Sequence, residues 1–137
     1  MSFLVDANVL SEPTKPQPVG QVVQWLRQNE SDLVISPIVL GVLEYGILAL
    51  PNGRRRIRLL NWLHAGPKTL NLSFFDAATA GVWAKLLADL RRKGRAMPIK
   101  DSLIAATALQ HGLILATRNT ADYRYVGVKL FDPFKGK

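Results

Sequence analysis

The sequence predicts an α/β fold, a three-layer α/β/α sandwich with a mainly parallel central sheet. Short continuous apolar runs, such as residues 113–116, are typical of strands that are covered on both faces. Longer segments with apolar residues at helical spacing separate these runs, as crossover helices separate parallel strands. The chain has 137 residues, of which 48% are hydrophobic, so we expect a single domain over residues 1–137 with a substantial core.

The N-terminal segment opens with a short strand followed by an acid. Residues 3–5 are apolar and deliver Asp6 at the carboxyl end of that strand. Prolines make the next stretch a loop, and apolar residues at helical spacing predict a helix over residues 19–29. Residues 33–35 are a second apolar run, so we expect this helix to cross back to a second strand.

A strong helix start follows the second strand. Ser36 is the expected N-cap and Pro37 suits the first helical position, so we predict a mostly apolar helix to about Leu50. A Pro-Asn-Gly break then leads into an arginine-rich helix over residues 54–64. Residues 70–72 are a candidate third strand.

The C-terminal half is predicted to hold two helices and two strands. The first helix is capped by Asp76 and stopped by Gly94, and the second covers residues 101–111 and ends at a glycine. Residues 113–117 then form a buried strand, and residues 128–131 form a last strand at an edge of the sheet. We find no internal repeat and no linker that divides the chain.

The second of these helices brings an acid back to a ligand-binding edge. The helix is about 16 Å long at about 1.5 Å per residue, and the strand after it is about 16 Å long at about 3.3 Å per residue. If the two pack antiparallel, Asp101 returns beside Thr117, Asn119 and Asp122. Open α/β sheets bind ligands at the carboxyl edge of their strands, so we expect a site there.

Charge is the most informative bulk property. Eighteen Lys and Arg against ten Asp and Glu give a formal charge of +8, which favours a polyanionic partner. Many basic domains bind no nucleic acid, so charge alone leaves both interpretations open, and clustering slightly favours a nucleic-acid partner. One cluster precedes Asp101 and is the expected contact with such a partner: Arg91, Arg92, Lys93 and Arg95.

Cysteine content and hydropathy bear on the compartment. The chain has no cysteine, which excludes a disulfide framework, a thiolate nucleophile and a cysteine zinc site. No apolar run reaches the roughly 18 residues of a membrane span, and the N-terminus lacks the pattern of a signal peptide. We therefore expect a cytoplasmic protein with no membrane partner.

Four positions carry the candidate chemistry: Asp6 at a strand end, Glu44 inside an apolar helix, Asp101 at a helix start, and the turn with Asn119 and Asp122. Taken singly, the aspartates are more often caps of turns and helices. A lone glutamate is costly to bury unless it faces water, pairs with a cation or binds a metal. Converging carboxylates repel each other unless a cation joins them, and a hard ion such as Mg²⁺ or Mn²⁺ fits oxygen ligands better than zinc does. Such an ion can activate water for attack on a phosphodiester.

At these residues the chain resembles the PIN-domain ribonucleases, specifically the VapC-type toxins of bacterial toxin–antitoxin pairs and their FitB-like branch. The resemblance rests on three blocks in order: LVDANVLSEP, SPIVLGVLEYGI and PIKDSLIAATALQHGLILATRNTADY. It implies a metal-dependent endoribonuclease with Mg²⁺ or Mn²⁺ as cofactor. By position, Asp6, Glu44 and Asp101 match the three principal acids of the family. Asn8 and Thr117 match polar residues near that site.

The chain departs from the family pattern at the fourth acid. Many members have aspartate at the position that Asn119 holds here, so we expect Asp122 to replace it as a ligand or to bind through water. One firmly held ion is then expected, with a second that arrives with substrate phosphate. The resemblance also implies three partners: an RNA substrate, a small antitoxin whose tail blocks the acidic pocket and which binds DNA, and a second copy of the chain in a homodimer.

Two alternatives from other classes stay open at this stage. In the first, a catalytically weak or inactive PIN-like module binds RNA or a partner and its acids are structural. In the second, the chain is a phosphoacceptor domain of the receiver type. That fold expects paired acids after the first strand and a lysine after a late strand, whereas this chain has Asp6 alone and Arg118. The receiver alternative is therefore the weakest of the three.

Overall fold

The centre of the molecule is a parallel β-sheet, which the computed structural model describes within residues 1–136. Its strands are β1 (Phe3–Val5), β2 (Leu33–Ile35), β3 (Asn71–Leu72), β4 (Ile114–Ala116) and β5 (Leu130–Phe131). The order across the sheet is β3-β2-β1-β4-β5, and each pairing between neighbours is parallel. The α/β prediction is confirmed, and β5 lies at an edge as expected.

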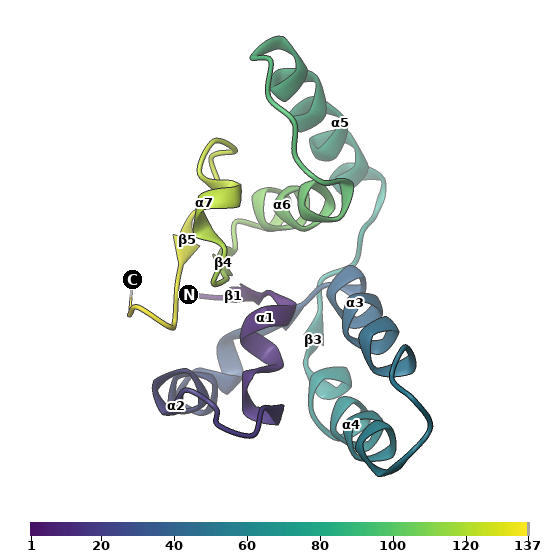
Figure 1. Cartoon of the computed structure of the whole chain (residues 1–137). Helices are drawn as coiled ribbons and strands as arrows, with labels where there is room; N and C mark the ends of the chain where they lie inside the picture. Colours follow the sequence, from purple (N-terminus) through teal and green to yellow (C-terminus); the bar gives the residue numbers. More distant parts are fainter. Residues whose placement is uncertain (137) are drawn as a thin grey trace.

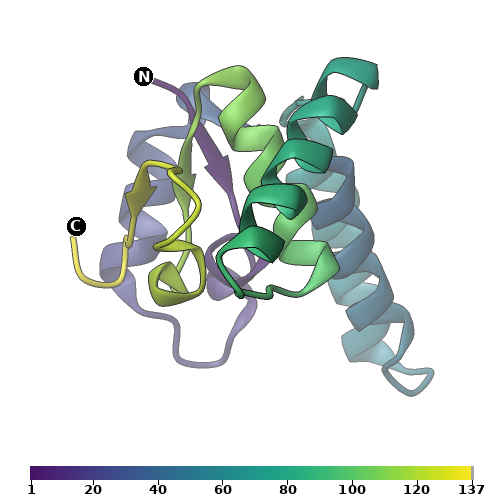
Figure 2. The same cartoon turned by 90° about the horizontal axis from the view of Figure 1, so that it is seen from above.

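Helices cover the sheet on two sides (Figure 1). The helix pair α5 and α6 lies on one side of the strands and α2 on the other, while α3 and α4 pack together near β3; Figure 2 shows the same arrangement from above. No helix in residues 1–136 is long and apolar enough to cross a bilayer. The bounds are α1 (Ala7–Leu10), α2 (Gly20–Gln28), α3 (Pro37–Leu48), α4 (Arg54–Ala65), α5 (Ala77–Arg92), α6 (Ile99–His111) and α7 (Thr120–Tyr123), with single 3-10 turns η1 (Glu12–Thr14), η2 (Glu30–Asp32) and η3 (Pro67–Thr69).

Helix boundaries follow local capping chemistry. The Ser36 hydroxyl accepts the Ile38 amide at 3.0 Å and Pro37 takes the first position of α3, as predicted. The prediction for α6 was two residues short, because Pro98 occupies its N-cap position and Asp101 lies within the first turn. The single-turn helices α1 and α7 were not predicted, since four residues are too few to show a helical period.

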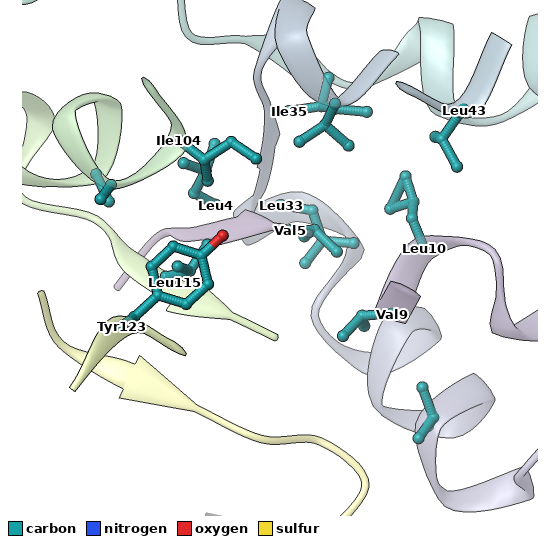
Figure 3. Close-up of a cluster of buried hydrophobic side chains, with 14 of the residues drawn as sticks. Leu4, Val5, Val9, Leu10, Leu33, Ile35, Leu43, Ile104, Leu115 and Tyr123 are labelled. Carbon is teal, nitrogen blue, oxygen red and sulfur yellow. The ribbon is translucent and has the colours of Figure 1, made fainter. Parts of the chain in front are cut away.

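The core lies between the central strands and α6. Leu4 and Leu115 on the strands and Ile104 on α6 are almost completely excluded from solvent. Figure 3 shows these side chains together with Tyr123, which α7 contributes to the same cluster. Each aliphatic side chain buried in this way contributes about 1.5–3 kcal/mol. The packing therefore fixes α6 and α7 against the sheet.

The opposite face of the sheet is closed by an aromatic group. The Trp25 ring of α2 lies 5.0 Å from the Phe3 ring and 5.3 Å from the Phe131 ring, between centroids. Such edge and tilted contacts add to the stabilisation from burial alone. They hold α2 across β1 and β5.

A buried polar contact ties α5 to α6 next to the candidate acid Asp101. The Trp83 indole N–H donates to the Ser102 hydroxyl at 2.9 Å, and that hydroxyl donates to the Ile99 carbonyl at 2.6 Å. At its other end α6 stops at Gly112, whose φ of +62° is a left-handed conformation that glycine adopts readily. The Trp83 contact thus holds the start of α6 against α5, and Gly112 ends the helix.

The loop before α2 is organised by a buried carboxylate, Glu12. Its side chain is 3% exposed; one oxygen accepts the Val19 amide at 2.9 Å and the other contacts Lys15 Nζ at 2.9 Å. The Val19 hydrogen bond, followed by Lys15, lowers the pKa of Glu12 below its ordinary value of 4.5, against the opposing effect of burial. The ionised form of Glu12 therefore stabilises the folded state.

We expect Glu12→Gln to lower the free energy of unfolding at neutral pH by about 1–3 kcal/mol, the scale of a hydrogen bond to a charged group. Because the pKa of Glu12 is lower in the folded than in the unfolded chain, its contribution is present above pH 4.5 and is lost as the pH falls through the folded-state value. Urea unfolding of both proteins should show a difference in the free energy of unfolding that becomes smaller below pH 4.5. A difference that stays constant with pH would show that the charge of Glu12 is not its cause. Lys15→Met removes only a half-exposed partner of Glu12, so it should lower the free energy of unfolding by less than Glu12→Gln does.

Candidate active site

Three aspartates from different elements lie at the carboxyl edge of the sheet. Asp6 follows β1, Asp101 lies in the first turn of α6, and Asp122 lies on α7 after β4. The charges of Asp6 and Asp122 both act on Asp101. The sequence prediction that α6 returns Asp101 to this edge therefore agrees with the structure.

Asp6 is the most firmly positioned of the three. Its side chain is nearly buried, and its amide donates to the Ala116 carbonyl at 2.9 Å across the β1–β4 edge. One carboxylate oxygen accepts the Ala7 amide and the other accepts the Thr117 hydroxyl, each at 2.8 Å. Asp6 therefore caps α1, which is the structural role that aspartates at such positions often have. Each of its oxygens keeps a further lone pair for a ligand.

Thr117 is the centre of the polar network beside Asp6. It is fully buried at the end of β4 and donates its hydroxyl proton to Asp6. The same oxygen accepts the Asn119 amide at 3.1 Å and lies 3.5 Å from the Asn8 side-chain nitrogen. Thr117 thus fixes the Asp6 carboxylate and the turn that leads to Asp122.

The electrostatics of Asp101 reflect its crowded position. Burial raises the pKa of its carboxyl, and the charges of Asp6 and Asp122 raise it further, while Tyr123 and Lys100 act in the opposite direction. A carboxylate whose neighbours disfavour its own charge is a group that a bound cation stabilises. The structure thus provides the repulsion between acids that the sequence predicted.

The Tyr123 hydroxyl faces the same acids from the core side. The residue is 1% exposed, and burial together with Asp6 and Asp101 raises the pKa of its phenol, so the hydroxyl keeps its proton. Within the described residues the hydroxyl oxygen has no partner at hydrogen-bond geometry. It therefore approaches Asp101 as a donor without closing a regular hydrogen bond to it.

Glu44 has a different partner from the aspartates. It lies on α3, its side chain is 40% exposed, and it forms an ion pair with Lys68 of η3 at 3.1 Å. A glutamate at this position was expected to face solvent, pair with a cation or bind a metal, and in the structure Glu44 is partly exposed and pairs with Lys68. Within residues 1–136 no group of three or more acidic or histidine side chains is drawn together as a ready metal cage.

The remaining predicted site residues lie on the surface. Asn119 and Asp122 are exposed at the start of the turn and on α7. The predicted RNA contacts Arg91, Arg92, Lys93 and Arg95 are also exposed, but Arg92 forms an ion pair with Asp89. That pairing makes Arg92 the least available of the group for a phosphate.

The donor set fits a hard divalent cation. Asp6, Asp101 and Asp122 offer only oxygen atoms, and the chain has no cysteine. Mg²⁺ typically binds through one or two carboxylates and keeps several waters, so the open arrangement of these acids suits it. Both histidines, His64 and His111, are exposed near helix ends.

Sequence reasoning missed Tyr123 and the Trp83–Ser102 contact. The signal for Tyr123 was its aromatic ring within an otherwise polar turn, but nothing local shows that the ring enters the core. The hydroxyl of Ser102 lies on the buried side of α6, next to Asp101, and its partner is 19 residues away. Long-range contacts of this kind leave no periodic signal.

Comparison with known proteins identifies close relatives over almost the whole chain. The PIN domain family model matches residues 3–128. Toxin FitB of Neisseria gonorrhoeae is 34% identical over 136 residues, which are 96% of this chain and 98% of FitB. VapC ribonuclease Y4jK of Sinorhizobium fredii is 32% identical over 97% of this chain and 98% of its own length. The solved structure of FitAB bound to an IR36 DNA fragment superposes with a TM-score of 0.89 at 32% identity, covering 96% of this chain and 95% of the matched chain.

Proposed function

The chain belongs to the PIN-domain family, and from that premise we propose that it is a metal-dependent endoribonuclease that acts as the toxin of a toxin–antitoxin pair. Two relatives support the proposal by name: one is a VapC ribonuclease and the other is Toxin FitB. The observation that carries it is that Asp6, Asp101 and Asp122 lie at one edge of a strongly basic protein, where the charges of Asp6 and Asp122 act on Asp101.

We assign the cation to Asp6, Asp101 and Asp122, with Mg²⁺ as the ion and Mn²⁺ as a substitute. When bound, a divalent ion lowers the pKa of water and stabilises the charge that develops on the leaving oxygen of a phosphodiester. Thr117 and the Ala7 amide hold the Asp6 carboxylate in place. The backbone amide of Asn119 donates to the Thr117 hydroxyl. The neutral side chain of Asn119 lies at the rim of the site and can orient water. Tyr123, which keeps its proton, faces Asp101 from the core side.

The role of Glu44 in this site requires an exchange of partners. Its ion pair with Lys68 is half-exposed, and exposed pairs contribute only about 0–1 kcal/mol, so the exchange is inexpensive. We propose that Glu44 leaves Lys68 to join the ion or its waters when the cation and RNA are present.

The partners are proposed by the same reasoning. The matched structure of FitAB is bound to DNA. We propose that this chain likewise pairs with a small antitoxin that blocks the acidic edge and binds DNA. We further propose that it forms a homodimer.

The test is cleavage of a pool of structured RNAs by protein freed of any bound partner, in Mg²⁺, Mn²⁺ or EDTA. We expect cuts with either ion, none in EDTA, and none from Asp6→Asn. Glu44→Gln and Lys68→Met separate the two roles of Glu44: we expect Glu44→Gln to lose activity and Lys68→Met to keep it. Circular dichroism confirms that each variant is folded.

A second candidate is a PIN-like module that binds RNA or a partner without cutting. The observation in its favour is that, within the described part of the chain, Glu44 is paired and the acids do not form a closed cage. This candidate predicts RNA binding that is the same in Mg²⁺ and EDTA, no cuts under either condition, and no effect of Asp6→Asn on affinity.

A further inference from the structure

A groove opens beside Asp122, between the end of α5 and α7. Its volume is about 440 Å³, which lies within the roughly 300–1,000 Å³ of typical ligand sites. Asp122 lines it, together with Arg95, Pro98 and Tyr125. Asp122 therefore belongs both to the lining of the groove and to the acids whose charge acts on Asp101.

The position of Arg95 in this groove is set by its backbone. Helix α5 ends at Arg92, and Gly94, with a φ of +67°, turns the chain. The Arg95 amide then donates to the Leu90 carbonyl at 2.9 Å, which anchors the residue to the end of the helix. The backbone of Arg95 is therefore fixed, which limits the positions that its side chain can reach.

Two guanidinium groups are held on one aromatic ring. The Arg95 guanidinium carbon lies 3.6 Å from the Tyr125 ring centroid, and that of Arg124 lies 4.8 Å from it. Tyr125 is 48% exposed. Stacking uses the flat face of a guanidinium, so the five N–H donors in its plane remain available, and the ring reduces the conformational freedom that binding must remove.

Neither guanidinium is neutralised by an acid. Among residues 1–136, Arg95 and Arg124 form no salt bridge, although Asp122 lines the same groove. Arg92, three residues before Arg95, is by contrast paired with Asp89. Two like charges kept together on a ring, without a counter-charge, form a site that favours an anion.

We infer that Arg95, Arg124 and Tyr125 form a clamp for a backbone phosphate of single-stranded RNA, next to the phosphate that is cut. This inference rests on the proposed nuclease function and adds the place where the substrate strand is gripped. Arg95 and Arg124 contact the phosphate, and Tyr125 is a positioning residue that holds them. The clamp binds ground state and transition state alike, so its loss should raise KM and leave kcat unchanged.

The experiment measures binding of a fluorescein-labelled single-stranded RNA in EDTA, by anisotropy at several salt concentrations, and cleavage of the same RNA in Mg²⁺. Arg95→Gln and Arg124→Gln should each weaken binding about tenfold and reduce the slope of log K against log salt by about 0.7. Arg27→Gln removes the same charge from an exposed arginine on α2, on the other side of the sheet (Figure 1), and should leave the slope unchanged. Tyr125→Leu should weaken binding, and Tyr125→Phe, which keeps the ring, should restore it.

The outcomes separate the clamp from the nuclease function. If the native protein cuts RNA and the arginine variants keep the native KM and salt slope, the clamp is overturned and the proposed function stands. The groove would then bind a protein partner or no partner. Native protein that cuts no RNA overturns the proposed function. The arginine variants together with the Arg27→Gln control still decide in EDTA whether the groove binds phosphate.

Discussion

Replacing Asp101 by asparagine is expected to lower the rate of RNA cleavage by about 10²–10³-fold, the scale for losing one group that stabilises developing charge. The change is nearly isosteric, so binding of RNA in EDTA should stay native. The matched control is Asp89→Asn, which removes the same charge from an exposed acid that pairs with Arg92 away from the site. Single-turnover cleavage in Mg²⁺ measures the difference between the two variants.

Asp101→Asn should also make the metal-free protein more heat-stable. The pKa of Asp101 is raised in the fold, so at neutral pH its ionised form destabilises the folded chain relative to the unfolded one, and asparagine removes that penalty. Mg²⁺ should then raise the melting temperature of the native protein more than that of the variant. This account of Asp101 would be contradicted by an inactive variant whose melting temperature in EDTA is lower than that of the native protein. The same variant would also have to show a rise in melting temperature with Mg²⁺ as large as the native protein's.

Thr117→Val is expected to reduce cleavage by about 10–100-fold, although Thr117 is not among the proposed ligands. Valine keeps the shape of threonine but removes the hydroxyl that donates to Asp6 and accepts the Asn119 amide. Groups that orient metal ligands typically matter on this scale. The free energy of unfolding should fall by about 1–3 kcal/mol, because two polar groups lose their partner.

Two further variants isolate the hydroxyl of Thr117. Thr117→Ser retains the hydroxyl and should keep most of the activity. Thr107→Val makes the same change at another fully buried threonine, whose hydroxyl donates to the Leu103 carbonyl within α6, and should leave cleavage unchanged. Equal activity losses for both valine variants would mean that the effect is general loosening of the core.

Much of the fold could be predicted from local patterns. Apolar runs marked the central strands, and the start of α3 was predicted from Ser36 and Pro37, because capping and strand burial depend on neighbouring residues. The return of Asp101 to the sheet edge followed from matching the length of a helix to that of a strand. Parallel pairing of β5 and the one-turn helices carried no such signal.

The site could be predicted only in part, because its decisive contacts are distant in sequence. Lys68 lies 24 residues from Glu44, so no helical spacing could show their ion pair. The Tyr125 stack depends on Arg95, which another element supplies. Residue types at strand ends indicate where acids gather, whereas the partners that hold or neutralise them depend on tertiary packing.

The most direct test of the central claim is a crystal structure of the partner-free protein soaked in Mn²⁺, with anomalous diffraction to locate the ion. We predict an anomalous peak in contact with Asp6 and Asp101 and near Asp122, absent from crystals of Asp101→Asn. If Glu44 joins it, its contact with Lys68 should be broken in the same crystals. An empty edge at saturating Mn²⁺, or ions bound only elsewhere, would contradict the proposal that these aspartates hold the catalytic cation.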